Sequence, residues 1–205
     1  RPYVIGIGLV YLCTWVFLLV FTLHQAANTF TFAGDAQSYS DAAGHIVHEG
    51  FYSLDGNIPY TDREPGQSLY LSVIYTVAGV RNRTAVFIVS GILYFFASLF
   101  FSRSLQTIAT HRATDIPLAL LLSLPSGSPL LFSLSREALA LITFLFFAGT
   151  FLRLLQSPSW RKAIIAGVLL GWLILTYVPF MLLPFFLLPL AYFLRLPMRY
   201  AIVVA

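Results

Sequence analysis

Six of the eight acidic residues in this 205-residue chain lie in one segment: Asp35, Asp41, Glu49, Asp55, Asp62 and Glu64. A seventh, Glu137, stands at the start of a separate apolar stretch. A carboxylate can take a proton from an attacking group, and grouped carboxylates can hold a divalent cation. We therefore expect chemistry in the segment over 35–64 and at the start of that apolar stretch.

Asp35 precedes a stripe of apolar residues at helical spacing that ends before Gly50. This pattern predicts a short amphipathic helix over 35–49. Asp35 then either caps the helix by accepting backbone N–H groups, or presents a carboxylate to a substrate one turn from Tyr39. Glu137 has a similar pair of interpretations, because the helix dipole alone favours an acidic residue in a first helical turn.

Three consecutive charged residues, Asp62, Arg63 and Glu64, stand directly before Pro65 and Gly66. One interpretation is an ordinary polar loop. The other is that Arg63 binds a phosphate through two parallel hydrogen bonds, because a planar guanidinium matches the geometry of a phosphate. Asp62 and Glu64 would then hold the arginine or a divalent ion.

The rest of the chain is strongly apolar. Hydrophobic residues make up 59% of it, charged residues make up 10%, and the mean hydropathy is +0.83. Soluble domains carry about 25% charged residues. This composition excludes a disordered chain, a nucleic-acid-binding module and an ordinary soluble enzyme, and it indicates a polytopic membrane protein. The formal charge of +4 is then assigned to loop arginines that set the orientation in the membrane.

Six apolar stretches are predicted to cross the bilayer: 2–23, 84–101, 116–134, 138–152, 163–178 and 179–194. The stretch 67–80 is too short to span and is predicted to lie at the interface, as is the amphipathic helix over 35–49. The predicted fold class is therefore all-α. It is a polytopic transmembrane bundle of about six spanning helices, with two juxtamembrane helices in an outer loop over 24–83.

The charges predict an orientation for this bundle. With Arg1 inside, eight Lys and Arg residues face the cytoplasm and four face outward, whereas seven of the eight acidic residues face outward. The positive-inside rule requires this imbalance. No predicted span carries an ionisable residue near its middle, which argues against a transporter. The single cysteine and the lean loops favour a bacterial inner (cytoplasmic) membrane, with the acidic site facing outward.

The order of these features resembles the GT-C superfamily of integral-membrane glycosyltransferases, nearest to the protein O-mannosyltransferase and lipid A aminoarabinose transferase branch. The resemblance rests on Gly34-Asp35 and Tyr39 after the first span, on Arg63-Glu64-Pro65-Gly66 before the short apolar segment, and on Ser135-Arg136-Glu137 before a later span. It covers about residues 3–194. Relatives continue further, so residues 1–205 are expected to form an N-terminal transmembrane catalytic module that is truncated at its C-terminus.

The resemblance implies inverting transfer of a sugar from a polyprenyl-phosphate-linked donor to a glycan, lipid or protein acceptor. It implies that Asp35 is the general base and that Glu137 is a second catalytic carboxylate. The substrate-binding residues expected are Tyr39, Tyr60, Arg63, Glu64 and Arg136. Glu64 stands where the aminoarabinose branch has lysine, which makes Arg136 a rival of Arg63 for the donor phosphate. A divalent cation is the one cofactor considered, with Asp35, Glu64 and Glu137 as its candidate ligands.

Two other functions stay open from the sequence. One is a non-catalytic polytopic membrane protein, such as a transporter or flippase subunit. The other is a polymerase or ligase of lipid-linked glycans, which would place its key basic residues in a large later loop. Membrane lipids are expected partners in each case, and nucleic acid is expected in none.

Overall fold

The computed structural model describes residue 16 and residues 35–60, 62–106, 136–194 and 196–204. These residues form an all-helical structure, with no β-strand among them beyond one bridge between Ser53 and Pro59. The helices are α2 (Asp35–Glu49), α3 (Pro65–Ala78), α4 (Arg83–Leu105), α6 (Arg136–Gln156), α7 (Trp160–Thr176), the 3-10 helix η2 (Val178–Leu182), α8 (Leu183–Phe193) and α9 (Met198–Val204). The predicted all-α class is confirmed for this part of the chain.

Both predicted juxtamembrane helices form, and their ends follow from local residue types. Helix α2 has the predicted bounds and stops at Gly50, whose φ of 69° suits glycine and whose N–H bonds to the Ile46 carbonyl at 3.0 Å. Helix α3 starts two residues earlier than predicted, because Pro65 occupies the first helical turn, where it has no N–H to leave unpaired. It ends before Gly79, whose φ is 92°.

Two of the described helices are long and apolar enough to cross a membrane, α4 and α6. Helix α4 starts at Asn82, whose side chain caps the helix by accepting a hydrogen bond from the Ala85 N–H at 3.0 Å. The two helices run side by side and pack through Tyr94, Ala97 and Ile142, which are buried. They correspond to the predicted spans 84–101 and 138–152.

The predicted spans 163–178 and 179–194 take a different form. Helix α7 ends at Thr176, and the next residues make η2 before α8 begins, so the second span is divided into a 3-10 turn and an 11-residue helix. Pro179 explains the interruption, because it disfavours helical geometry in the residue before it and lacks a backbone donor. The predicted spans 2–23 and 116–134 lie outside the described residues.

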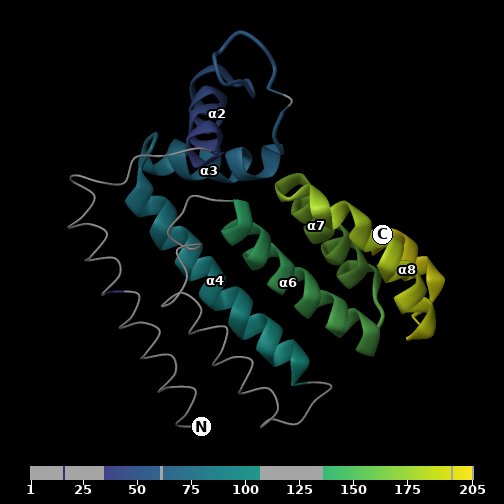
Figure 1. The fold of residues 1–205 in the computed structure, drawn as a ribbon. Helices are drawn as coiled ribbons and strands as arrows, with labels where there is room; N and C mark the ends of the chain where they lie inside the picture. The colour runs from purple at the N-terminus through teal and green to yellow at the C-terminus, as the bar shows by residue number, and fades with distance from the viewer. Residues whose placement is uncertain (1–15, 17–34, 61, 107–135, 195, 205) are drawn as a thin grey trace.

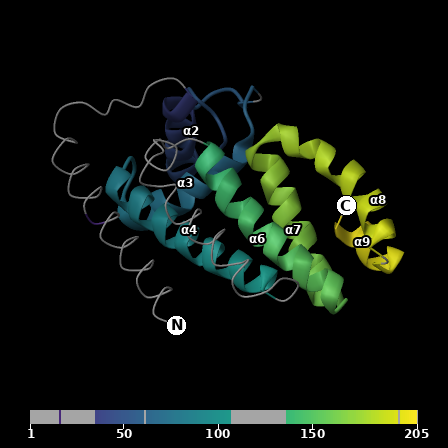
Figure 2. The ribbon, with the colours of Figure 1, turned by 60° about the horizontal axis from the view of Figure 1, so that its bottom comes forward.

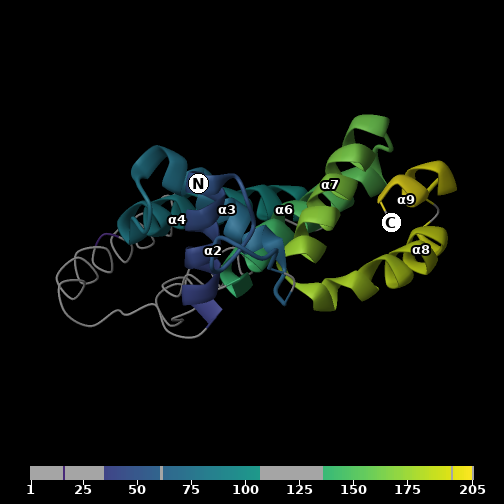
Figure 3. The ribbon, with the colours of Figure 1, turned by 90° about the horizontal axis from the view of Figure 1, so that it is seen from above.

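The helices are arranged as a slanted layer with a cap at one end. Figure 1 shows α2 standing on α3, and α3 lying across the ends of the slanted helices α4, α6 and α7. Figure 2 shows α6 and α7 side by side, with α8 and α9 beyond them. Seen from above, α8 leads away from α6 (Figure 3). The cap formed by α2, α3 and their connection is called the capping end below.

Helix α2 uses its apolar face within the protein. Tyr39 and Ala43 are fully buried, and they pack against Leu71, Ile74 and Tyr75 of α3. The sequence predicts that this apolar face lies on a membrane surface. In the structure the face is instead buried against α3. Ser40 and the Tyr75 hydroxyl add a buried hydrogen bond of 2.8 Å between the two helices.

The loop between α2 and α3 contains a turn that is closed by its own hydrogen bonds. The Asp55 carboxylate accepts hydrogen bonds from the backbone N–H groups of Asn57 and Ile58 at 2.9 and 3.1 Å and from the Ser53 hydroxyl at 2.9 Å. These hydrogen bonds favour the ionised form and lower the pKa of Asp55 to about 2. Gly56 sits inside the turn with a φ of 78°, which a residue with a side chain rarely adopts.

Candidate functional site

The structure pairs Asp35 with Arg63. Arg63 Nη2 lies 2.7 Å from Asp35 Oδ1, and Nη1 donates to Oδ2 at 2.9 Å, so the guanidinium holds both carboxylate oxygens. The pair ties the first turn of α2 to the residues just before α3. About half of the Asp35 side chain (51%) stays exposed, which leaves its carboxylate accessible from solvent.

A second pair, between Glu64 and Arg136, lies deeper. Arg136 Nη1 donates to Glu64 Oε2 at 2.6 Å, and the two side chains are 22% and 13% exposed. The other Glu64 oxygen accepts a hydrogen bond from the backbone N–H of Val178 at 3.4 Å. Glu64 therefore joins the start of α3 to the start of α6 and to η2, three segments far apart in the sequence.

Two tyrosines enclose this pair. The fully buried Tyr39 donates its hydroxyl hydrogen to Glu64 Oε2 at 3.3 Å, and its oxygen accepts from Arg136 Nη1 at 3.3 Å. The Tyr177 ring lies under the guanidinium, with its centroid 5.1 Å from Arg136 Cζ. Burial raises the pKa of Tyr39 to about 12, although the Arg136 charge opposes the rise. Tyr39 is therefore a neutral hydrogen-bonding group in this site.

Glu64 stays ionised despite its burial. Burial by itself would raise the pKa of this carboxyl group, but hydrogen bonds from backbone N–H groups, including that of Val178, and the Arg136 guanidinium outweigh it and lower the pKa. A negative charge is thus fixed between α3, α6 and η2. Arg136 in turn contacts Glu64, the Tyr39 hydroxyl and the Tyr177 ring.

Tyr60 and Tyr52 support Arg63 from the loop side. A side-chain hydrogen bond with Tyr60 and the charge of Asp35 raise the pKa of Arg63. The Tyr52 hydroxyl donates to the Arg63 carbonyl at 3.2 Å, and the two tyrosine rings lie 5.6 Å apart. Arg63 is therefore held in place, while its side chain remains one-third exposed (34%).

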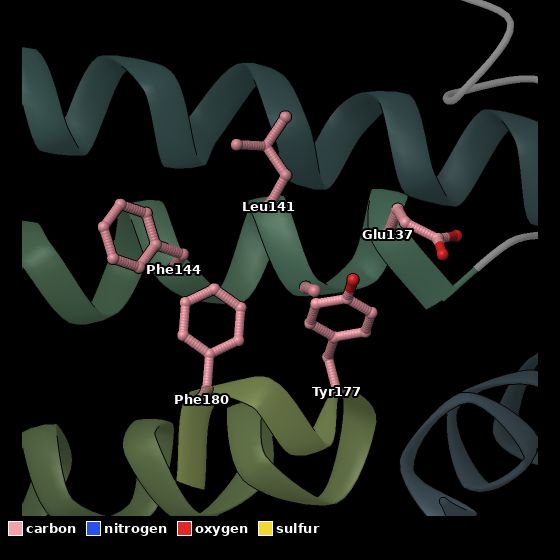
Figure 4. A pocket seen from close by; sticks show the side chains of 6 residues that line it. Glu137, Leu141, Phe144, Tyr177 and Phe180 are labelled. Carbon is pink, nitrogen blue, oxygen red and sulfur yellow. The ribbon is translucent and has the colours of Figure 1, made fainter. Parts of the chain in front are cut away.

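Glu137 lies beside an apolar pocket. The pocket has a volume of about 220 Å³ and opens to the surface, and it is lined by Glu137, Ala140, Leu141, Phe144, Tyr177 and Phe180. Figure 4 shows the Tyr177 and Phe180 rings projecting from the η2 segment toward α6, with the Glu137 carboxylate at one end of the row. The nearest cation is Arg136, whose Nε lies 3.6 Å from Glu137 Oε1. The pocket thus has a charged end and an aromatic body.

The structure brings together the predicted site residues of three chain segments. Asp35 and Arg63 form one pair, and Glu64 and Arg136 form the next, with Tyr39 contacting both Glu64 and Arg136. Tyr60 contacts Arg63, and Glu137 follows Arg136 in α6. These seven residues form a continuous network, which is called the capping-end network below.

A divalent-cation site at Asp35, Glu64 and Glu137, which the sequence leaves open, receives less support than the rest of the network. Within the described ranges, no group of three or more His, Cys, Asp or Glu side chains is close enough to hold a metal ion. Asp35 and Glu64 are each engaged by an arginine instead. The residues present therefore do not make a three-carboxylate site for a cation.

Sequence reasoning missed Tyr177, Val178 and Phe180. Val178 contributes through its backbone N–H. Almost every residue has such a group, so the residue type does not identify it. Tyr177 and Phe180 were assigned to a boundary between two spans, and the available signal was Pro179, which favours an interruption between the helices. The interruption is what turns these two rings toward α6.

Comparison of the chain with protein-family models, with curated proteins and with solved structures finds no match. Membership of the GT-C superfamily therefore stays a prediction from the motif residues.

Proposed function

We propose that this protein is a membrane glycosyltransferase that moves a sugar from a polyprenyl-phosphate-linked donor to an acceptor on the outer side of a bacterial inner membrane. The observation that carries the proposal is the capping-end network. Carboxylates and arginines from α2, the start of α3 and the start of α6 converge at one end of a largely apolar helical structure. A bundle of about six spans would embed the apolar part in the bilayer and leave this network at headgroup level.

In the proposed reaction, Asp35 is the general base. Its carboxylate takes the proton of the acceptor hydroxyl while the acceptor oxygen bonds to the anomeric carbon of the sugar. The bond between that carbon and the phosphate oxygen breaks, and the polyprenyl phosphate leaves with the electron pair and the negative charge. The bidentate contact with Arg63 supports this role because it fixes the orientation of the carboxylate, and the exposure of Asp35 leaves room for an acceptor.

Arg63 is the better of the two candidate ligands for the donor phosphate. Arg136 is already engaged by Glu64, Tyr39 and the Tyr177 ring. Arg63 is more exposed and is held by Tyr60 and Asp35 at the edge of the network. A cation at this place stabilises the charge that develops on the departing phosphate.

The pocket beside Glu137 supports a substrate with an apolar part. Its aromatic body suits the isoprenoid portion of a donor next to the phosphate, and Glu137 at the charged end suits the hydroxyl groups of a sugar or an acceptor. A metal ion is left out of the proposal, because the candidate ligands Asp35, Glu64 and Glu137 each lie beside an arginine.

The test compares two aspartates of the same helix. Asp35→Asn removes the proposed base, whereas Asp41→Asn removes a carboxylate that pairs with Arg81 at 2.6 Å on another part of α2. Membranes containing the full-length protein are incubated with a panel of polyprenyl-phosphate-linked sugars, and release of polyprenyl phosphate is followed by mass spectrometry. We expect Asp35→Asn to lower the rate by about 100- to 10,000-fold, as loss of a general base does.

The control variant Asp41→Asn is expected to keep the rate within a few-fold of the unsubstituted protein. Equal rates for Asp35→Asn and Asp41→Asn, with both proteins folded in the membrane, would contradict the role of Asp35. In that case the Asp35–Arg63 pair is a structural contact, and a non-catalytic polytopic protein becomes the better interpretation.

A further inference from the structure

Among the described residues, the end of the bundle opposite the capping-end network carries cations and no carboxylate. Five basic side chains lie at the ends of α4 and α6 and at the starts of α7 and α9: Arg103, Arg153, Arg161, Lys162 and Arg199. All seven acidic residues in the described part of the chain belong to positions 35–64 or are Glu137, at the other end. This group of cations therefore has no carboxylate among the described residues to neutralise it.

Two of these cations serve the packing of the helices. Arg153 Nε donates to the Ser104 hydroxyl at 2.9 Å, and its guanidinium lies 4.4 Å from the centroid of the Phe100 ring, which ties α6 to α4. Lys162 Nζ donates to the carbonyl oxygens of Arg153 and Ser157 at 3.2 and 2.8 Å, which ties α7 to the end of α6. Both are therefore committed to the protein itself.

Arg161 and Arg199 are exposed and lie on either side of an aromatic pair. Trp160, which precedes Arg161, packs edge-on against Tyr200 with ring centroids 5.2 Å apart, and Arg199 Cζ lies 4.9 Å from the Tyr200 ring centroid. Trp160 is half exposed (50%) although its ring is large and apolar. The Arg199 guanidinium therefore lies over a buried tyrosine that packs against the half-exposed Trp160, and Arg161 follows Trp160 directly in the chain.

An exposed apolar face continues from this group along α7. Ile164, Ile165 and Val168 are 54%, 52% and 66% exposed. They follow Arg161 by one to two helical turns, so along the helix the surface changes from the aromatic and cationic residues Trp160 and Arg161 to aliphatic residues. A molecule that matches this order has an anionic head and a hydrocarbon tail.

We infer that Arg161, Arg199 and Trp160 bind the phosphate headgroup of an anionic phospholipid of the surrounding bilayer, with the buried Tyr200 supporting Arg199 and Trp160 from below. A guanidinium binds a phosphate bidentately, and tryptophan and tyrosine rings prefer the headgroup level of a membrane. Basic groups near the ends of membrane helices attract anionic lipids in this way. A nucleic acid or free phosphate would leave the aliphatic face of α7 unused.

This lipid site does not depend on the proposed sugar transfer. It lies at the opposite end of the bundle from Asp35, and it needs only that the helices sit in a bilayer. If the glycosyltransferase proposal is wrong, the inference of a lipid site is unaffected. If the lipid site is absent, the proposed role of Asp35 is unaffected.

The experiment uses Trp160 as the reporter. Every tryptophan of the full-length protein other than Trp160, including Trp15 and Trp172, is replaced by phenylalanine. The protein is reconstituted in phosphatidylcholine vesicles that contain a minor fraction of brominated lipid, which quenches nearby tryptophan fluorescence. We expect brominated phosphatidylglycerol to quench Trp160 more strongly than brominated phosphatidylcholine at the same fraction. The double substitution Arg161→Gln with Arg199→Gln is expected to lower this preference by about ten- to thirty-fold, because each arginine at a membrane surface contributes separately.

The matched control removes the same charge at the other end. Arg81→Gln with Arg83→Gln is expected to leave the preference of Trp160 for the anionic lipid unchanged. Arg161→Lys with Arg199→Lys keeps the charge and loses the paired hydrogen bonds, so it is expected to lower the preference less than the glutamine substitutions do. Equal quenching by the two lipids, quenching by neither, or loss of the preference on addition of inorganic phosphate would each overturn the inference. The comparison of the two lipids needs no charge substitution, so a variant that fails to fold does not prevent the test.

Discussion

Glu64 makes contacts that hold three parts of the chain in register. It bonds to Arg136 of α6 and to the N–H of Val178, and it accepts from Tyr39 of α2. The net contribution of such a buried pair to folding is small, but removing one partner leaves the other charge buried and unpaired, which costs about 3–5 kcal/mol in well-buried cases. Glu64 is therefore best understood as the residue that positions Arg136 and, through the chain, its neighbour Arg63.

The low pKa of Glu64 predicts a pH dependence of stability. A carboxyl group whose pKa is lower in the folded state stabilises the protein fully above its unfolded pKa of about 4.5, and this contribution is lost as the pH falls below that value. Glu64→Gln keeps the shape of the side chain and removes the titration. Thermal unfolding in detergent is expected to show the variant less stable at pH 7, with the difference shrinking as the pH falls from 5 toward 3.

The control for this prediction is Asp41→Asn, which breaks the exposed pair with Arg81, whose side chain is 62% exposed. Exposed pairs contribute about 0–1 kcal/mol, so its effect on the melting temperature should be small at every pH. A difference between Glu64→Gln and the unsubstituted protein that stays constant down to pH 3 would show that the charge of Glu64 does not stabilise the fold.

The residue types of the site follow from the sequence, but their pairing does not. The sequence identifies Asp35, Arg63, Glu64, Arg136 and Glu137 because charged residues at the edges of apolar stretches are conspicuous. It leaves open whether Arg63 or Arg136 is available to a substrate, since Glu64 and Arg136 are far apart along the chain. The packing of α3 against α6 and α7 brings Arg136 Nη1 to 2.6 Å from Glu64 Oε2. The spacing of residues along the chain does not predict this contact.

At the scale of the elements, Gly66 sets how closely α3 approaches α7. A Cβ atom at this position would lie 2.6 Å from the Thr176 hydroxyl and 2.7 Å from the Leu175 carbonyl, closer than van der Waals contact allows. The carbonyl belongs to the backbone, so the helices would have to separate. The start of α3, which carries Glu64 to its partners, would move with them.

Gly66→Ala is therefore expected to destabilise the protein by about 1–3 kcal/mol, the usual cost of overpacking. Chemical unfolding in detergent measures it. Gly171→Ala is the matched control, because a Cβ atom there has no neighbour within 4 Å and alanine favours a helix over glycine. If both variants are as stable as the unsubstituted protein, the contact between α3 and α7 tolerates more space than the structure indicates.

The sequence predicted most described elements because their signals are local. Gly50 and Pro65 mark a helix end and a helix start, and the ends of α2 and α3 are correct within two residues. The 3-10 helix η2 was not predicted, because Pro179 indicates that the helix is interrupted but does not determine the backbone conformation of the interruption. The upright position of α2 on α3 was missed as well, because an apolar stripe indicates burial but does not identify what covers it.

At the scale of the whole molecule, the described charges divide between the two ends. The capping end carries seven carboxylates and the four arginines Arg63, Arg81, Arg83 and Arg136, a formal charge of −3, whereas the opposite end carries five cations and a charge of +5. From the positive-inside rule we expect the second end to face the cytoplasm. The capping-end network is then expected on the outer side.

Cysteine labelling tests this orientation. In a Cys13→Ser background, which leaves no cysteine in residues 1–205 and in which any cysteine elsewhere in the protein is also replaced by serine, Asn57→Cys marks the loop at the capping end and Pro158→Cys marks the turn between α6 and α7. A membrane-impermeant maleimide added to intact cells or spheroplasts is expected to label position 57 at once and position 158 only after permeabilisation. The reverse order would place the acidic end inside and would contradict both the orientation and the outward-facing reaction.

The closed turn around Asp55 has a consequence for how this surface can evolve. The hydrogen bonds of the Asp55 carboxylate join residues within a few positions of one another, and beyond them the turn is held by the His45 ring of α2, 3.0 Å from the Leu54 carbonyl. Exposed tip positions such as Asn57 and Ile58 can change their side chains while the backbone shape is kept by Ser53 and Asp55. Natural variants could thus diversify what this rim touches without disturbing the arginine–carboxylate pairs beneath it.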